Sequence, residues 1–166
     1  MADGASFSLT GLDELLGKLD AMDYDTKRKG GRFALRKAAQ VIRDRARANA
    51  AQVDDPLTPE SIEQNIVERW NGRHFRRTGE LGFRVGVLGG ARQYQGEIQA
   101  KGKDNPGGDT YYWRFLEFGT SKMQAQPIMR PAMDEGQSEA MQAFTTHYNR
   151  SIDRAIRRAK RRAVKP

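Results

Sequence analysis

The stretch that decides the fold is Tyr111-Tyr112-Trp113-Arg114-Phe115-Leu116-Glu117-Phe118-Gly119-Thr120, which is followed by Pro127-Ile128-Met129-Arg130-Pro131-Ala132-Met133. The aromatic residues of the first segment favour a strand over residues 111–118, with alternate side chains on opposite faces. Gly119 offers a backbone conformation that other residues avoid, as a turn requires. Pro131 is typical of the first turn of a helix. The two segments therefore predict a strand, a turn and the start of a helix.

Other segments upstream also favour strands and loops. Residues 81–88 predict a half-buried strand, because Leu81, Phe83, Val85 and Val87 alternate onto one face. Residues 61–70 suit both a helix and a strand, and we favour a short helical turn that runs into extended chain. Asn71-Gly72-Arg73 signals a turn, and residues 94–101 form a weaker candidate for a hairpin partner. Residues 101–110 have the composition of a flexible loop.

Helical spacing of apolar residues predicts three helices. A short strand at residues 7–9 precedes the first helix, over residues 10–22, and a basic joint at residues 24–31 follows it. The second helix covers residues 32–50. The last is a long amphipathic helix opened by Pro131. The apolar stripe of the second helix comprises Leu35, Ala38, Ala39, Ile42 and Ala46, and that of the last comprises Met133, Met141, Phe144, Tyr148, Ile152, Ala155, Ile156, Ala159 and Ala163.

Composition limits the class of protein. The 166 residues are enough for one domain, and 37% hydrophobic against 30% charged residues indicates a modest core. The absence of cysteine excludes disulfides and cysteine-based metal sites. No apolar run approaches the length of a membrane span, and the N-terminus lacks the pattern of a signal peptide. We therefore expect a protein made in a cytoplasm, with no membrane partner.

The positive charge is concentrated near the C-terminus. Residues 150–166 hold eight basic residues and one acidic residue, which leaves 21 basic and 20 acidic residues in the rest of the chain. We therefore divide the chain into a single domain at residues 1–149 and a basic helical extension at residues 150–166. Three interpretations stay open for the extension: a solvated helix face, a surface for an acidic protein, and contact with nucleic-acid phosphates. The residues that would make such contacts are Arg154, Arg157, Arg158, Lys160, Arg161 and Arg162.

No constellation of residues predicts catalysis, a cofactor or a metal. His74 and His147 lie far apart in the sequence, without the spacing of metal ligands. Asp54-Asp55 is better explained as a solvated loop. Glu117 could act as a catalytic acid, but we favour a structural acceptor for a turn or for a neighbouring subunit's arginine. We therefore expect a protein that is not an enzyme.

The chain resembles the gene-product-10-like tail-component family of tailed phages, which are lambda-like head–tail joining or tail-completion proteins. The resemblance rests on the segments quoted first, from Tyr112 to Thr120 and from Pro127 to Ala132, and on the upstream helix from Leu35 to Arg47. In the loop before residue 62 the chain departs from the family's pattern, with Pro59 where glycine is expected. The resemblance covers most of residues 7–145.

The resemblance implies an α+β fold, in which a twisted, mainly antiparallel sheet packs against N-terminal helices and a long C-terminal helix. It implies a structural virion protein at the neck or proximal tail, assembled in the host cytoplasm, which completes the tail and joins it to the head connector. The implied partners are connector or stopper, tail-terminator and tail-tube proteins, and copies of the chain itself in a ring, with six subunits as one option. The residues that we assign to the partner interface are Trp113, Glu117, Phe118, Gly119, Thr120 and Arg130.

Two alternatives remain at this stage. One is a tail-terminator ring protein, which occupies a different position in the tail. The other is a non-specific nucleic-acid-binding protein, although binding domains of that kind usually spread basic residues over the whole fold.

Overall fold

The computed structural model describes residues 24–54, 57, 59–89, 101–102 and 105–163. The fold is α+β, as expected, with long helices at both ends of the described chain and a two-stranded antiparallel sheet between them in sequence. The elements are α2 (Tyr24–Val53), α3 (Ile62–Asn65), β1 (Ile66–Trp70), α4 (Gly72–Thr78), β2 (Phe83–Val87), α5 (Trp113–Phe118) and α6 (Met129–Ala163). The predicted elements at residues 7–9 and 10–22, and nearly all of the one at 94–101, lie outside the described residues.

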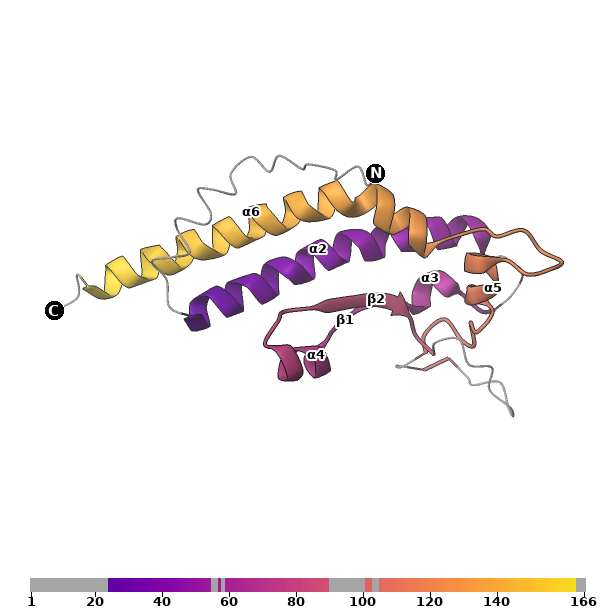
Figure 1. The fold of residues 1–166 in the computed structure, drawn as a ribbon, viewed down its shortest axis with the longest axis horizontal. Coiled ribbons are helices and arrows are strands. Elements are labelled where there is room, and N and C mark those ends of the chain that lie inside the picture. The colour runs from indigo at the N-terminus through magenta and orange to yellow at the C-terminus, as the bar shows by residue number, and fades with distance from the viewer. Residues whose placement is uncertain (1–23, 55–56, 58, 90–100, 103–104, 164–166) are drawn as a thin grey trace, which may run out of the picture.

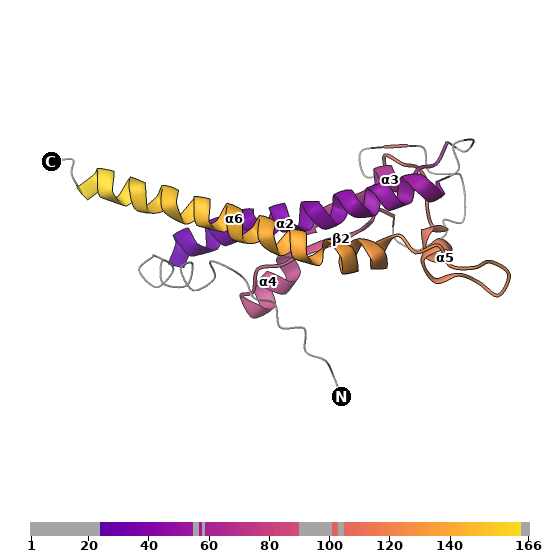
Figure 2. The same ribbon diagram turned by 90° about the horizontal axis from the view of Figure 1, so that it is seen from above.

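The two long helices, α2 and α6, form an antiparallel pair that sets the length of the molecule (Figures 1 and 2). The first turns of α6 lie beside the last turns of α2, where the Asn49 side chain donates a hydrogen bond to the Ile128 carbonyl at 3.1 Å. At the opposite end, the Tyr148 hydroxyl donates to the Lys27 carbonyl at 3.1 Å. In Figure 1, α2 lies between α6 and the sheet.

Glycines allow the two helices to approach closely at two points along the pair. A Cβ atom on Gly30 would lie 2.8 Å from the Ser151 hydroxyl, and one on Gly136 would lie 2.8 Å from the side chains of Ile42 and Arg45. The prediction of a joint at residues 24–31 is wrong, because these residues form the first turns of α2. Glycine weakens an isolated helix, but here the packing against α6 needs its small size.

The sheet confirms two of the predicted strands. Residues 83–87 form β2, and residues 61–70 form a helical turn followed by β1, as we favoured. Ser61 caps α3, because its hydroxyl accepts from the Gln64 backbone nitrogen at 3.3 Å. In the antiparallel register, Ile66 pairs with Val87 and Trp70 with Phe83.

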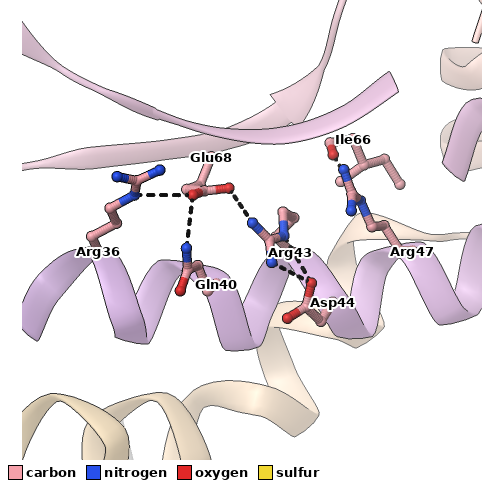
Figure 3. Close-up of polar contacts among 7 residues, drawn as sticks. All are labelled: Arg36, Gln40, Arg43, Asp44, Arg47, Ile66 and Glu68. Atoms are coloured by element: carbon pink, nitrogen blue, oxygen red, sulfur yellow. Dashed lines mark hydrogen bonds and ion pairs between the residues drawn. The ribbon is translucent and has the colours of Figure 1, made fainter. Parts of the chain in front are cut away.

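A buried carboxylate attaches the sheet to α2 (Figure 3). Glu68 of β1 accepts from the side chains of Arg43 at 2.6 Å, Gln40 at 3.1 Å and Arg36 at 3.2 Å. Burial alone would raise the pKa of Glu68, but hydrogen bonds from Gln40 and Arg43 outweigh it and hold the pKa at about 2. Arg47 donates to the Ile66 carbonyl at 3.0 Å, also between α2 and β1. These contacts were not predicted, because they join side chains far apart in sequence.

The core is small and built largely from alanine and isoleucine, which agrees with the modest core expected from composition. Its buried members are Ala46, Ala50, Ile62, Ile66, Ile128 and Ala132. The stripe predicted for α6 is displaced at its start, because Met133 and Met141 are exposed whereas Ala132 and Gly136 are buried. Small residues occupy these positions because α2 lies so close to this part of α6.

The structure also differs from two predictions made for loops. Asn71-Gly72-Arg73 begins helix α4 instead of forming a simple turn, since the Asn71 side chain caps the helix by accepting from the His74 backbone nitrogen at 3.3 Å. The end of the predicted flexible loop is fixed by buried Asn65. Its amide donates to the Gly108 carbonyl and the Thr110 hydroxyl, both at 2.8 Å, and accepts from the Gly107 nitrogen at 2.8 Å.

Candidate partner interface

The segment predicted as a strand at residues 111–118 is instead a short helix, α5. The buried Glu117 and the half-buried Trp113 lie one turn apart and face inward, whereas Arg114 and Phe118 are exposed. This four-residue spacing is helical, and tertiary contacts of the inward residues override the strand preference of the aromatic side chains. The prediction of a strand was therefore wrong.

Glu117 caps the N-terminus of α6. Its carboxylate accepts from the backbone nitrogens of Ile128 at 2.7 Å, Met129 at 2.8 Å and Arg130 at 3.0 Å. The guanidinium of Arg130 adds a 3.2 Å contact to the carboxylate and donates to the Glu117 carbonyl. Burial alone would raise the pKa of Glu117, but the backbone donors outweigh it and lower the pKa below its ordinary value. The carboxylate thus satisfies donors that a helix start leaves unpaired.

This cap closes the connecting segment at residues 119–127 into a compact loop. The Gln126 nitrogen donates to the Leu116 carbonyl at 2.7 Å, and the Thr120 nitrogen donates to the Met123 carbonyl at 2.9 Å. Gly119 has a φ of 75°, in the region that favours glycine, as expected from the sequence. The loop projects at one end of the molecule (Figure 1).

The structure separates five of the six predicted interface residues into two groups, while Gly119 forms the turn that follows α5. Glu117 is buried and Trp113 packs against the core, so both support the loop from inside. Phe118 is 69% exposed, and the Arg130 guanidinium lies 5.4 Å from the centre of its ring. The exposed residues Phe118, Thr120, Met123 and Arg130, here called the loop patch, form the candidate interface. Met123 was missed because only the loop closure brings it to the patch.

An open apolar groove of about 470 Å³ adjoins the loop patch. It lies between α2, β2 and the start of α6, and Arg130 belongs to both surfaces. Its apolar lining includes Leu35, Ala38, Ala39, Ile42, Phe83, Val85, Met129, Met133 and Ala140. Three of the residues predicted for the stripe of the second helix, Leu35, Ala38 and Ala39, are only half-buried because they line this groove.

The predicted basic residues lie at the opposite end of the molecule (Figures 1 and 2). The last turns of α6 carry Arg154, Arg157, Arg158, Lys160 and Arg161 as exposed side chains, and the helix continues through Arg162 to Ala163. The helix runs without a break past residue 150, and Ile152 is buried against the rest of the fold. The two sets of predicted site residues are therefore not brought together.

The described residues contain no group of three or more histidine or acidic side chains that could hold a metal ion. His74 lies 2.9 Å from Glu80 at the surface, and His147 stacks edge-on against Phe33, with 5.8 Å between the ring centres. Both histidines thus have local structural contacts. No helix in the described part of the chain is long and apolar enough to cross a membrane.

Comparison with known families places the chain among phage proteins. Residues 13–119 match the family model described as "Bacteriophage HK97-gp10, putative tail-component". The chain belongs to the HK97-gp10-like family. This confirms the resemblance seen in the sequence and assigns the protein a structural role in the tail of a bacteriophage, in contact with other tail proteins. Searches of curated proteins and of solved structures returned no significant match.

The family match covers the sheet, α2 and α5, and it ends at Gly119. The loop from Thr120 onward and all of α6 lie beyond the matched residues. The HK97-gp10-like region therefore includes Glu117, whereas the backbone nitrogens that Glu117 caps belong to the part of the chain outside the match.

Proposed function

We propose that this tail component completes the tail and joins it to the head connector at the neck. The observation that carries the proposal is the loop patch, in which the exposed Phe118 and Met123 are presented by a loop that Glu117 fixes from within. A surface that is ordered before binding loses less conformational entropy on association. Such a preformed projection suits a protein whose mechanism is assembly instead of catalysis.

The composition of the loop patch supports a protein partner. Aromatic, methionine and arginine side chains are enriched at the centres of protein interfaces. Phe118 and Arg130 are already in contact, and the apolar groove extends the surface beyond Arg130. We assign this surface to a neighbouring protein of the neck, which is a connector, stopper, terminator or tube subunit.

Copies of the chain form a closed ring in the virion in this proposal. A cyclic ring joins two different patches of each subunit, one on each side. The loop patch lies at one end of the molecule (Figure 1), so it can contact a neighbouring neck protein while other surfaces join copies of the chain.

Electron microscopy of particles made without this gene tests the position in the tail. Full heads beside separate tails of normal length are expected if the protein joins the two. Tails of uncontrolled length would instead assign it the terminator role. Intact and infectious particles would overturn both assignments.

Complementation with interface variants tests the loop patch itself. Phe118→Ser combined with Met123→Ser should reduce the yield of joined particles by at least about tenfold, because the apolar side chains that would fill the partner's surface are removed. Met141→Ser is the matched control, since Met141 is 43% exposed on α6, away from the patch. Equal yields from the double variant and the control would remove the loop patch from the interface, while leaving the gene-inactivation result unchanged.

A further inference from the structure

We propose that a composite surface, formed by the first turns of α2 and the last turns of α6, binds the phosphate backbone of duplex DNA without reading its sequence. This cationic surface comprises Lys29, Arg154, Arg157, Arg158, Lys160 and Arg161, all of which are exposed. Its geometry and charge are independent of the loop patch, so DNA binding holds or fails separately from the joining role.

The antiparallel helix pair creates this surface from two parts of the sequence. The Tyr148 hydroxyl bonds to the Lys27 carbonyl across a separation of 121 residues. The absence of a side chain on Gly30 lets Ser151 lie directly against α2. The start of α2 is thereby held against α6, whose last turns extend beyond it in both ribbon views (Figures 1 and 2).

A groove of about 580 Å³ lies at this junction. Lys29 lines it from α2, whereas Arg154 and Arg158 line it from α6. The Ser151 side chain also lines the groove, next to the position that a Gly30 Cβ atom would take. Two guanidinium groups, an ammonium group and a hydroxyl are donors suited to the oxygens of a phosphate.

The two helix ends that meet here are both strongly basic. Residues 27–37 contain six basic residues and no acidic residue, and residues 150–166 contain eight basic residues and one acidic residue. From the distribution of charge along the sequence, the C-terminal run alone stands out as an excess of positive charge. The fold brings Lys29 of the first run beside Arg154 and Arg158 and so raises the positive potential at this end of the molecule. The guanidinium of Arg32 instead lies over the Trp70 ring, and that of Arg36 bonds to Glu68, on the side of α2 that faces the sheet.

The lining favours a nucleic-acid backbone over an acidic protein. Protein interfaces usually have large apolar side chains at their centre. Among the described residues that line this groove, Phe33 is the single large apolar side chain, and α6 contributes only Ala155 and Ala159 as apolar ones. Along α6, the rise from Arg154 to Arg161 is about 10 Å, which is roughly a third of one turn of duplex DNA. Binding to the phosphates along a duplex requires a row of cations of this kind and no large apolar side chains.

Fluorescence anisotropy with a labelled 30-base-pair duplex tests this inference on the full chain at rising NaCl concentrations. The test variant combines Lys29→Ala, Arg154→Ala and Arg158→Ala. The control variant combines Arg84→Ala, Arg114→Ala and Lys122→Ala, which are exposed on β2, α5 and the loop and change the net charge equally. Circular dichroism of all three proteins verifies that the variants are folded.

We expect the wild type to bind duplexes of unrelated sequence equally, with an affinity that falls steeply with salt. The test variant should bind at least about tenfold more weakly, and its salt slope should be smaller by about 0.9 for each phosphate that it no longer neutralises. The control should bind like the wild type. Equal weakening of both variants, or no binding at 50 mM NaCl, would overturn the proposal. Displacement of the duplex by polyglutamate at equal charge concentration would assign the surface to an acidic protein.

Discussion

The carboxylate of Glu117 lies 2.7 Å from the backbone nitrogen of Ile128, so the last turn of α5 supplies the cap of α6. A residue at the end of one helix thereby fixes where the next one starts. The loop between them is short and closed because both of its ends are tied to this carboxylate. Stability of the fold and presentation of the loop patch consequently depend on the same side chain.

Glu117→Ala should lower the free energy of unfolding by about 2–4 kcal/mol, because it leaves helix-start donors unpaired around a buried site. Urea denaturation measures this change. Glu135→Ala is the control, since the Glu135 side chain is 68% exposed and its nearest ion-pair distance to Arg45 is 3.8 Å. A loss below about 0.5 kcal/mol for Glu117→Ala, within the range of ordinary surface substitutions, would mean that the cap does not hold the loop.

Acid should weaken the attachment of the sheet to α2. The pKa of Glu68 is about 2 in the folded protein against an ordinary value of 4.5, so its charge stabilises the fold above pH 4.5. This contribution, on the order of 3 kcal/mol at most, disappears as the pH falls from about 5 to about 2. Urea denaturation at several pH values should show the wild type converging on Glu68→Gln over this window. A constant difference between the two proteins would contradict the assignment.

Gly136→Ala should destabilise the protein by about 1–3 kcal/mol, although alanine favours an isolated helix. The added methyl group would lie 2.8 Å from side-chain atoms of Ile42 and Arg45 and would push α2 and α6 apart. Thermal denaturation of Gly136→Ala and of Gly86→Ala provides the comparison, because a Cβ atom on Gly86 meets nothing within 4 Å. Increased stability of Gly136→Ala would show that the helices can separate without cost.

Asn65→Ala should free the segment at residues 105–110, since it removes the amide that holds Gly107, Gly108 and Thr110. The expected decrease in the free energy of unfolding is about 1–3 kcal/mol, for the buried polar groups left unpaired. Hydrogen exchange at the Gly107 amide is expected to accelerate strongly. Gln64→Ala, at an exposed neighbouring position, should leave that exchange unchanged.

Local patterns predicted much of the fold. The alternation of Phe83, Val85 and Val87 identified β2, and helical spacing identified α2 and α6. The strand prediction at residues 111–118 failed because α5 is set by the inward contacts of Trp113 and Glu117, which a local aromatic pattern does not reveal. The start of α2 was missed for a related reason, since Gly30 and Gly31 suggest a break unless the packing partner is known.

The sequence pointed to several residues of the candidate surfaces but not to their arrangement. The sequence indicated both Phe118 and the C-terminal arginines as contact residues. It could not show that Met123 joins Phe118 in one patch, or that Lys29 lies across a groove from Arg154. Those relationships arise from loop closure and from antiparallel helix packing, which connect residues distant in sequence.

The close contacts of Gly30 and Gly136, at two points along the α2–α6 pair, fix the spacing that the two helices must share. One extra residue inserted in α2 between Gly30 and Ile42 would rotate everything beyond it by about 100°. Both contacts could then no longer form together. We therefore expect that, among family members, lengths differ in the connections between elements, while the number of residues separating these two contact points stays constant.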